Sequence, residues 1–199
     1  RGVPAERMVL IDAGEVVDLG GLICAATPAA HEEMTRNADG FLFLGYVLIG
    51  GGVRIWHSGD TIPWPGQVEW LLPLRIDLAL LPVNGRDNLR SANGVPGNLT
   101  LDEAVQLADA IGAGAMLGHH FGLFDFNTID PVEGRARLAA MQPRCDVELV
   151  RPATAYSITA LQPVEDFKST LYQIAAVCQQ LAHLIPTVDH SEKMTWISD

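Results

Sequence analysis

The chain has 199 residues, of which 48% are hydrophobic and 19% are charged. This length and composition fit one folded globular domain and exclude a disordered chain. The formal net charge of −11 argues against binding to nucleic acid, because that binding depends on Lys and Arg to neutralise phosphates. It also disfavours an anionic substrate unless an arginine or a metal ion reverses the local field.

The sequence predicts a protein that does not bind membranes. The longest apolar stretch, 41–53, is interrupted by glycines and is shorter than the roughly 20 residues that a membrane helix needs. No signal-peptide pattern is visible at the start. Cys24, Cys145 and Cys178 are far apart and fit a reducing compartment, so we expect a cytoplasmic protein.

The first half of the chain predicts strands. Short apolar runs bounded by Gly, Asp and Pro indicate strands at 8–12 and 20–27. Two further runs, 41–49 and 53–57, flank three consecutive glycines and predict a hairpin. The near-continuous apolar run 77–83 is typical of a strand that is buried on both faces.

The second half alternates helices with strands, which predicts an α/β sheet covered by helices. Thr100 and Glu103 form a capping box, and apolar residues follow at helical spacing. Asp130 and Pro131 begin a second helix that runs to about Met141. The remaining strands are expected within 112–118, at 146–150 and at 155–159.

A predicted linker at 161–164 leads to one more helix, which Pro186 ends. We expect this helix to pack on the preceding domain, and a helix–helix contact in a homo-oligomer is the alternative. The chain is therefore divided into a domain over 1–160 and a helix with a tail over 161–199. The apolar seam of the helix consists of Phe167, Leu171, Ile174, Cys178, Leu181 and Ile185.

Residues of the kind that bind metals follow three separate predicted strands. His31 comes after the strand at 20–27, Asp60 comes after that at 53–57, and His119-His120 come after the short strand at 115–117. Side chains just past strand ends can meet at one edge of a sheet. Imidazole and carboxylate ligands suit Zn, Mn or Fe. Taken singly, Asp60 is also explained as a turn residue and the histidine pair as a cap.

The residues around these positions resemble the metallo-β-lactamase superfamily. Within it, the chain is similar to the L-ascorbate-6-phosphate lactonase branch, where a strand ends in Pro-(Ile/Val)-Asn-Gly-Arg-Asp. The resemblance covers about 8–159 and implies the αββα sandwich, of which this chain is the C-terminal portion with an extra C-terminal helix. The matching segments are Ser58-Gly59-Asp60-Thr61, 77–87, Gly97-Asn98, 103–108 and 118–124.

The resemblance implies a centre with two divalent metal ions, Mn or Zn. His31 matches a metal-binding histidine of the family, and Asp60 matches the aspartate that bridges the two ions. His120 matches the last histidine because Phe121-Gly122 follow it, and His119 is the alternative. Asp60 and His120 are the predicted catalytic residues.

The sequence departs from the family in one respect. Family members carry a His-x-His-x-Asp-His motif earlier in the chain, and these 199 residues do not. His57 stands alone and is expected to pack beside its strand. Since three ligands do not complete a dinuclear site, we expect a fragment whose N-terminal half is missing or lies on a partner chain. A half-protein completed by association and a degenerate, metal-free homologue are the alternatives.

The resemblance implies a hydrolase that opens a lactone or a related ester by attack of a metal-bridging hydroxide. The expected substrate is a small molecule such as a phosphorylated sugar-acid lactone. Arg86 is predicted to bind its phosphate or carboxylate, and Asn84 and Asn98 to donate hydrogen bonds to it, although turn chemistry alone also explains these residues. A phosphodiesterase or nuclease on the same fold and a metal-free scaffold subunit are the alternative functions.

Overall fold

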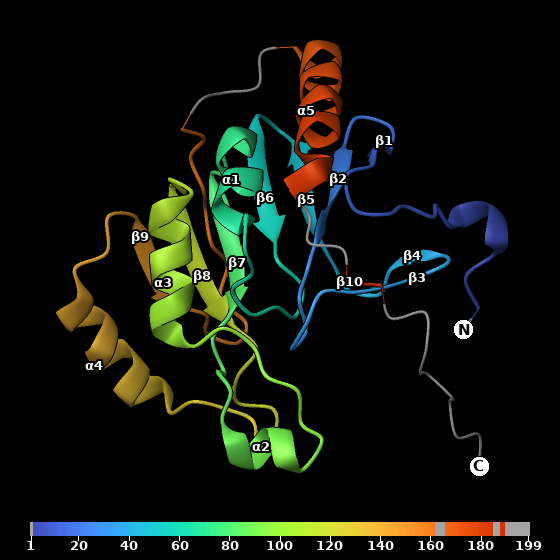
Figure 1. Ribbon diagram of the computed structural model, residues 1–199. Coiled ribbons are helices and arrows are strands. Elements are labelled where there is room, and N and C mark those ends of the chain that lie inside the picture. Colours follow the sequence, from blue (N-terminus) through green and yellow to red (C-terminus); the bar gives the residue numbers. More distant parts are fainter. Residues whose placement is uncertain (1, 162–165, 185–187, 190–199) are drawn as a thin grey trace.

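A computed structural model describes residues 2–161, 166–184 and 188–189. The chain folds around a seven-stranded sheet with the order β1-β2-β5-β6-β7-β8-β9, beside a smaller sheet with the order β10-β3-β4 (Figure 1). The large sheet consists of β1 (Val16–Asp18), β2 (Ile23–Pro28), β5 (Leu44–Gly50), β6 (Val53–His57), β7 (Leu78–Pro82), β8 (Ala115–His119) and β9 (Asp146–Leu149). The small sheet consists of β3 (Thr35–Asn37), β4 (Gly40–Phe41) and β10 (Val188–Asp189).

The strand directions bring four strand ends to one edge of the large sheet. β5 is antiparallel to both β2 and β6, so β2 and β6 run in the same direction. β7 and β8 are parallel to β6. The segments that follow β2, β6, β7 and β8 therefore all start at the same edge, as the sequence predicted.

Helices cover one face of this sheet. The helix α3 (Leu101–Ala110) contacts β7 and β8, α4 (Pro131–Met141) contacts β9, and α5 (Phe167–Leu181) contacts β1 and β2 (Figure 1). Val47, Trp56 and Met116 of the sheet share one buried core with residues of α3 and α5, which we call the helix-side core. The other helical segments are η1 (Ala5–Arg7), α1 (Gln67–Leu71), η2 (Leu72–Leu74), α2 (Asn88–Ala92) and η3 (Ala182–Leu184).

The opposite face of the sheet is also apolar. Because side chains alternate along a strand, the residues between those of the helix-side core point the other way. Tyr46 and Leu48 on this face are each 36% exposed, and neither belongs to the helix-side core. The strand register aligns two rows across the face: Cys24, Leu48, Ile55, Leu78 and Ala115, and Ala26, Tyr46, His57, Leu80 and Leu117. We call these rows the open face.

Most predicted elements are confirmed, and two predicted strands are wrong. The capping box of Thr100 and Glu103 is present, and Asp130 caps α4 through its side chain. The segments 8–12 and 155–159 form no strand. Their composition resembles that of a strand, but a strand also requires a neighbouring strand to hydrogen-bond with.

The last helix packs on the domain, as expected. Ile174 and Cys178 of its seam are buried and belong to the helix-side core. Because these seam residues pack inside the chain's own core, the sequence pattern no longer argues for a helix–helix contact between copies of the chain. Ile185, most of the predicted linker and nearly all of the tail lie outside the described residues.

Candidate metal centre

Asp60 and His120 lie together at the edge where the four strands end. His120 Nδ1 is 3.5 Å from Asp60 Oδ1, and both side chains are a little more than one-third exposed. His120 follows β8 directly and has a φ of 64°, in the left-handed region. Few residues other than glycine adopt this conformation, and such residues concentrate at functional sites. The backbone thus turns the imidazole toward the loop that carries Asp60.

Gly59 shapes that loop. Its φ is 66°, and a Cβ built there would lie 2.3 Å from the carbonyl oxygen of Leu44. Its N–H donates to His57 Nδ1 at 3.0 Å. Only glycine fits both the backbone angle and the space, so the residue before Asp60 is fixed by local sterics.

His57 and His119 project from the open face beside this pair. The centroids of their rings are 4.7 Å apart. The pKa of His119 is lowered to about 4, mainly by burial and next by neighbouring His57, while a hydrogen bond to the backbone of Leu80 opposes the shift. Burial also lowers the pKa of His57, against the attraction of Asp60. Both rings are therefore neutral at pH 7, the form in which imidazole binds metals.

His31 lies in the adjacent loop. The N–H of Ala30 donates to Thr61 Oγ1 at 3.1 Å, and Ile62 N–H donates to the carbonyl of Ala30 at 2.8 Å. These bonds join the segment that carries His31 to the one that carries Asp60. The His31 ring packs edge-on against Phe43 with a centroid separation of 5.1 Å.

The buried nitrogens of two histidines suit a metal ion. His31 Nδ1 and His119 Nε2 are both buried without a hydrogen-bond partner. An unpaired buried imidazole nitrogen is costly unless something binds it, and nitrogen and carboxylate oxygen are common ligands of divalent ions. Across the part of the chain that the structure describes, however, no three His, Cys, Asp or Glu side chains are grouped closely enough to hold one ion. The donors fit a metal in kind, and the described residues do not complete its ligand shell.

The predicted substrate residues Asn84 and Asn98 are both 1% exposed. Asn98 Nδ2 donates to Asn84 Oδ1 at 3.1 Å, and Asn84 Nδ2 donates to Asn127 Oδ1 at 2.7 Å. Asn98 Oδ1 is buried without a partner. These amides connect the loops after β7 and β8 with the segment before α3.

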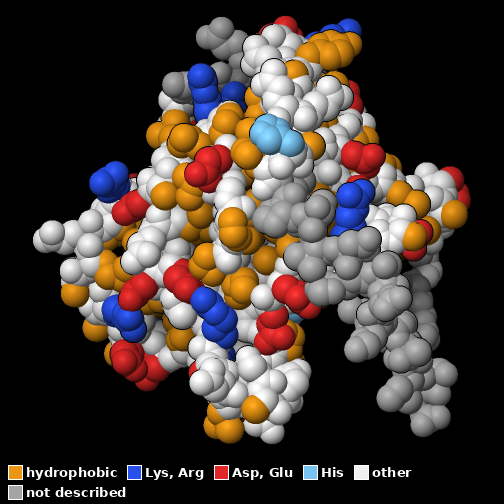
Figure 2. Space-filling view, in the orientation of Figure 1, with side chains coloured by type: hydrophobic (Ala, Val, Ile, Leu, Met, Phe, Trp, Pro, Cys, Tyr) orange, Lys and Arg blue, Asp and Glu red, His pale blue; other side chains and the backbone are white. Residues whose placement is uncertain are grey.

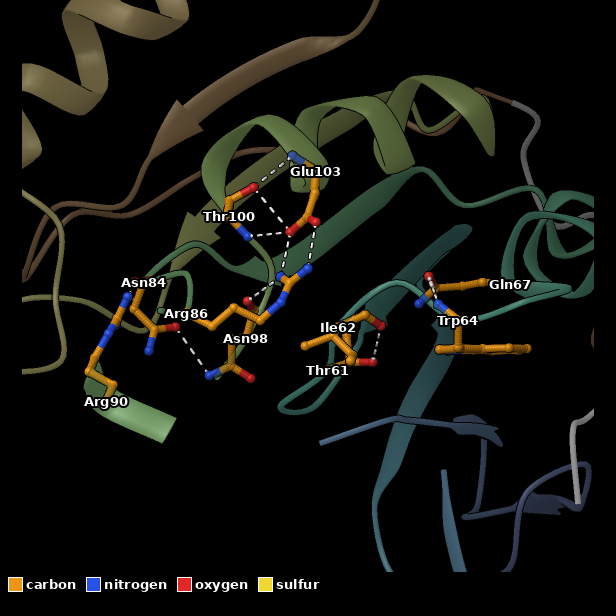
Figure 3. Close-up of polar contacts among 10 residues, drawn as sticks. All are labelled: Thr61, Ile62, Trp64, Gln67, Asn84, Arg86, Arg90, Asn98, Thr100 and Glu103. Atoms are coloured by element: carbon orange, nitrogen blue, oxygen red, sulfur yellow. Dashed lines mark hydrogen bonds and ion pairs between the residues drawn. The ribbon is translucent and has the colours of Figure 1, made fainter. Parts of the chain in front are cut away.

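Arg86 binds a carboxylate of its own chain (Figure 3). Its two terminal nitrogens donate to the Glu103 oxygens at 2.6 and 2.7 Å, and Nη1 also reaches the carbonyl of Asn98 at 3.0 Å. Burial works to raise the pKa of Glu103, but hydrogen bonds from Arg86 and Thr100 lower it overall. In this structure the guanidinium fork thus positions the loop after β7 against α3.

Arg90, Asn127 and His57 also lie at this edge, and the sequence did not mark them as site residues. Arg90 Nη1 donates to the Asn84 carbonyl at 2.9 Å and to Asn127 Oδ1 at 2.8 Å. His57 contacts His119 although β7 lies between their strands. These partners follow from the tertiary arrangement of strands and loops, and no short motif marks them.

Comparisons with known proteins show which family the chain belongs to. Residues 1–121 match the family described as Beta-lactamase superfamily domain. A protein named UPF0173 metal-dependent hydrolase from Methanosarcina mazei is 28% identical over 164 residues, which cover 79% of this chain and 64% of that protein. A protein of the same name from Methanoculleus marisnigri is 30% identical over 129 residues, covering 62% of this chain and 51% of that protein. The chain thus spans between half and two-thirds of the length of these relatives.

Solved structures share the fold at low sequence identity. Igni18, a metallo hydrolase from Ignicoccus hospitalis, superposes with a TM-score of 0.57 at 19% identity and covers 73% of this chain and 58% of that one. Isothiocyanate hydrolase from Delia radicum gut bacteria superposes with a TM-score of 0.60 at 14% identity and covers 77% of this chain and 59% of that one. Within the described ranges, no helix is both long and apolar enough to cross a membrane.

Proposed function

Because the chain belongs to the beta-lactamase superfamily domain family, we propose that it forms the C-terminal part of a metal-dependent hydrolase that acts on a lactone or related ester. The observation that carries this proposal is the pairing of Asp60 with His120 at the edge where β2, β6, β7 and β8 end. The names of the two relatives as metal-dependent hydrolases support it.

His31, Asp60 and His120 are the proposed ligands, with His119 as the alternative to His120. Two divalent ions, Mn or Zn, would supply a Lewis acid and a water of lowered pKa when bound. Asp60 would bridge the two ions, and its carboxylate is more than one-third exposed at the edge of the sheet. The buried, unpaired nitrogen of His31 supports its role as a ligand.

The remaining ligands are proposed to come from a segment outside these residues, either earlier in the same polypeptide or on a partner chain. The open face supports this proposal, because sheets of this kind are normally covered on both faces. Apart from His57, its two rows are apolar from β2 to β8, and His119 points to the same side as His57. A second sheet packed there would cover the apolar rows and could bring further ligands to Asp60.

Substrate contacts by Asn84, Arg86 and Asn98 remain proposals. Arg86 would reach a substrate phosphate or carboxylate only by releasing Glu103, which binds both ends of its fork. The amide donors of Asn84 and Asn98 are used within the protein. We therefore propose that these three residues first position the loops of the site, and that a phosphorylated sugar-acid lactone is one substrate to test.

The test is a hydrolysis assay on the protein purified with its upstream segment or co-purifying partner. Added Mn²⁺ or Zn²⁺ should activate cleavage of lactones, and Asp60→Asn and His120→Ala should each reduce kcat at least a hundredfold. The matched control is His183→Ala, since His183 is exposed on η3, outside the proposed site. Cleavage of bis-p-nitrophenyl phosphate without cleavage of any lactone or ester would overturn the proposed reaction. Absence of bound metal in the complete protein would favour a scaffold.

A further inference from the structure

The loop that follows His120 carries three large apolar side chains into solvent. Leu123 is 81% exposed, Phe124 53% and Phe126 65%. The rings of Phe124 and Phe126 have centroids 5.6 Å apart and planes inclined by 31°. Single exposed apolar residues are common, but a cluster of them marks a binding surface. We call Leu123, Phe124 and Phe126 the apolar lip.

Hydrogen bonds fix the base of this loop. The N–H of Gly122 donates to Thr128 Oγ1 at 2.7 Å. The side-chain oxygen of Asn127 accepts from Asn84 Nδ2 at 2.7 Å and from Arg90 Nη1 at 2.8 Å. The aromatic rings are thus presented on an anchored loop, and binding to them costs little ordering entropy.

The lip closely follows a residue of the proposed metal centre along the chain. Its first residue, Leu123, is three positions after His120, whose Nδ1 is 3.5 Å from Asp60 Oδ1. By contrast, Phe121 packs against the helix-side core. The apolar side chains therefore stand on the same loop as a proposed metal ligand.

The arginines of the neighbouring cavity do not favour an anionic group. This cavity, about 380 Å³, lies between the starts of α3 and α4 and the loop after β7. Its arginines form the pairs Arg86–Glu103, Arg90–Asp87 and Arg137–Asp102. An external phosphate would have to displace one of these carboxylates. On the face shown in Figure 2, basic side chains are scattered and form no large patch.

We propose that the apolar lip binds an aliphatic or aromatic substituent of the ester or lactone substrate. This inference rests on the proposed function and narrows its substrate class. The exposed aromatic rings on their anchored loop favour an apolar substituent. The arginines of the neighbouring cavity are already paired with carboxylates, so they do not favour a phosphorylated one. A bilayer surface and a second copy of the chain are the competing occupants.

The first experiment compares p-nitrophenyl esters from acetate to octanoate, using the metal-loaded protein with its upstream segment or partner. Burying a methylene fully favours binding roughly fourfold, and about twofold when one side stays in water. We expect kcat/KM to rise about fifteenfold from butanoate to octanoate, mainly through KM. The double variant Phe124→Ser/Phe126→Ser should lose this rise. The matched control is Tyr172→Ser, because Tyr172 is 73% exposed on α5.

A second experiment does not depend on hydrolysis. Calorimetry should detect binding of octanoate but not acetate to the metal-free protein, and the double variant should weaken octanoate binding about tenfold. If no ester is cleaved but this binding difference is present, the proposed reaction fails and the lip remains a binding site. Equal octanoate binding by wild type and double variant would overturn the inference. So would lip-dependent binding to phosphatidylcholine vesicles, or lip-dependent dimerisation in sedimentation, without any chain-length effect.

Discussion

Replacing Gly59 by alanine tests how the loop before Asp60 is built. The change adds a Cβ at a φ of 66° and at 2.3 Å from the Leu44 carbonyl oxygen. The left-handed conformation costs a non-glycine residue about 1–2 kcal/mol, and forcing an atom into filled space costs about 1–3 kcal/mol more. We expect the free energy of unfolding to fall by about 3 kcal/mol. That corresponds to roughly 6–12 °C in Tm for a chain of this size.

Gly51→Ala is the matched control. Gly51 has a φ of 59°, and a Cβ there meets nothing within 4 Å. Gly51→Ala should therefore lower the free energy of unfolding only by the cost of the left-handed conformation, about 1 kcal/mol. Urea unfolding followed by tryptophan fluorescence measures both variants. If Gly59→Ala destabilised the protein no more than Gly51→Ala, the steric account of this loop would be refuted.

Three further predictions concern the rest of the chain. Because the pKa of Glu103 is lowered in the folded state, its pairing with Arg86 stabilises the protein above the ordinary pKa of 4.5 and ceases to do so as pH falls through the lowered value. In urea unfolding, Glu103→Gln should thus lower the free energy of unfolding by about 2 kcal/mol at pH 7 and by clearly less at pH 3. An equal loss at both pH values would contradict the pairing. Burial raises the pKa of Cys145 and Cys178 to about 11, so mass spectrometry should show neither alkylated by iodoacetamide at pH 8 until the protein unfolds. Trp56→Phe should lower the free energy of unfolding by about 2 kcal/mol in the same urea assay, because it leaves Thr27 buried without the indole N–H that donates to its Oγ1 at 3.1 Å. A loss below about 0.5 kcal/mol would show that this bond contributes little.

Elements with a local signal could be predicted from the sequence. The capping box at Thr100 and the proline at the start of α4 specify helix ends within a few residues. The two apolar runs that flank Gly50-Gly51-Gly52 are likewise a local signal, and they predicted β5 and β6. The segments 8–12 and 155–159 look equally apolar but form no strand, because pairing depends on a neighbouring strand that their own residues do not encode.

The candidate site was predictable in its positions and not in its contacts. His31, Asp60 and His120 follow strands that end at one edge, and this could be inferred from the order of the elements. The contact between His57 and His119 depends on the sheet order, which places β7 between their strands. Glu103 was recognised as a capping residue, yet it also binds Arg86 from 17 positions away. Such a double role becomes visible only when α3 packs beside the loop after β7.

A crystal structure of the complete protein, with diffraction recorded at the zinc and manganese absorption edges, tests the proposed centre most directly. We predict anomalous peaks within about 2.0–2.2 Å of an Asp60 carboxylate oxygen and a His120 nitrogen, with His31 bound to one of them. A peak at His119 in place of His120 would change one ligand and leave the centre intact. Metal bound elsewhere, or no peak near Asp60, would contradict the assignment of this edge as a metal centre.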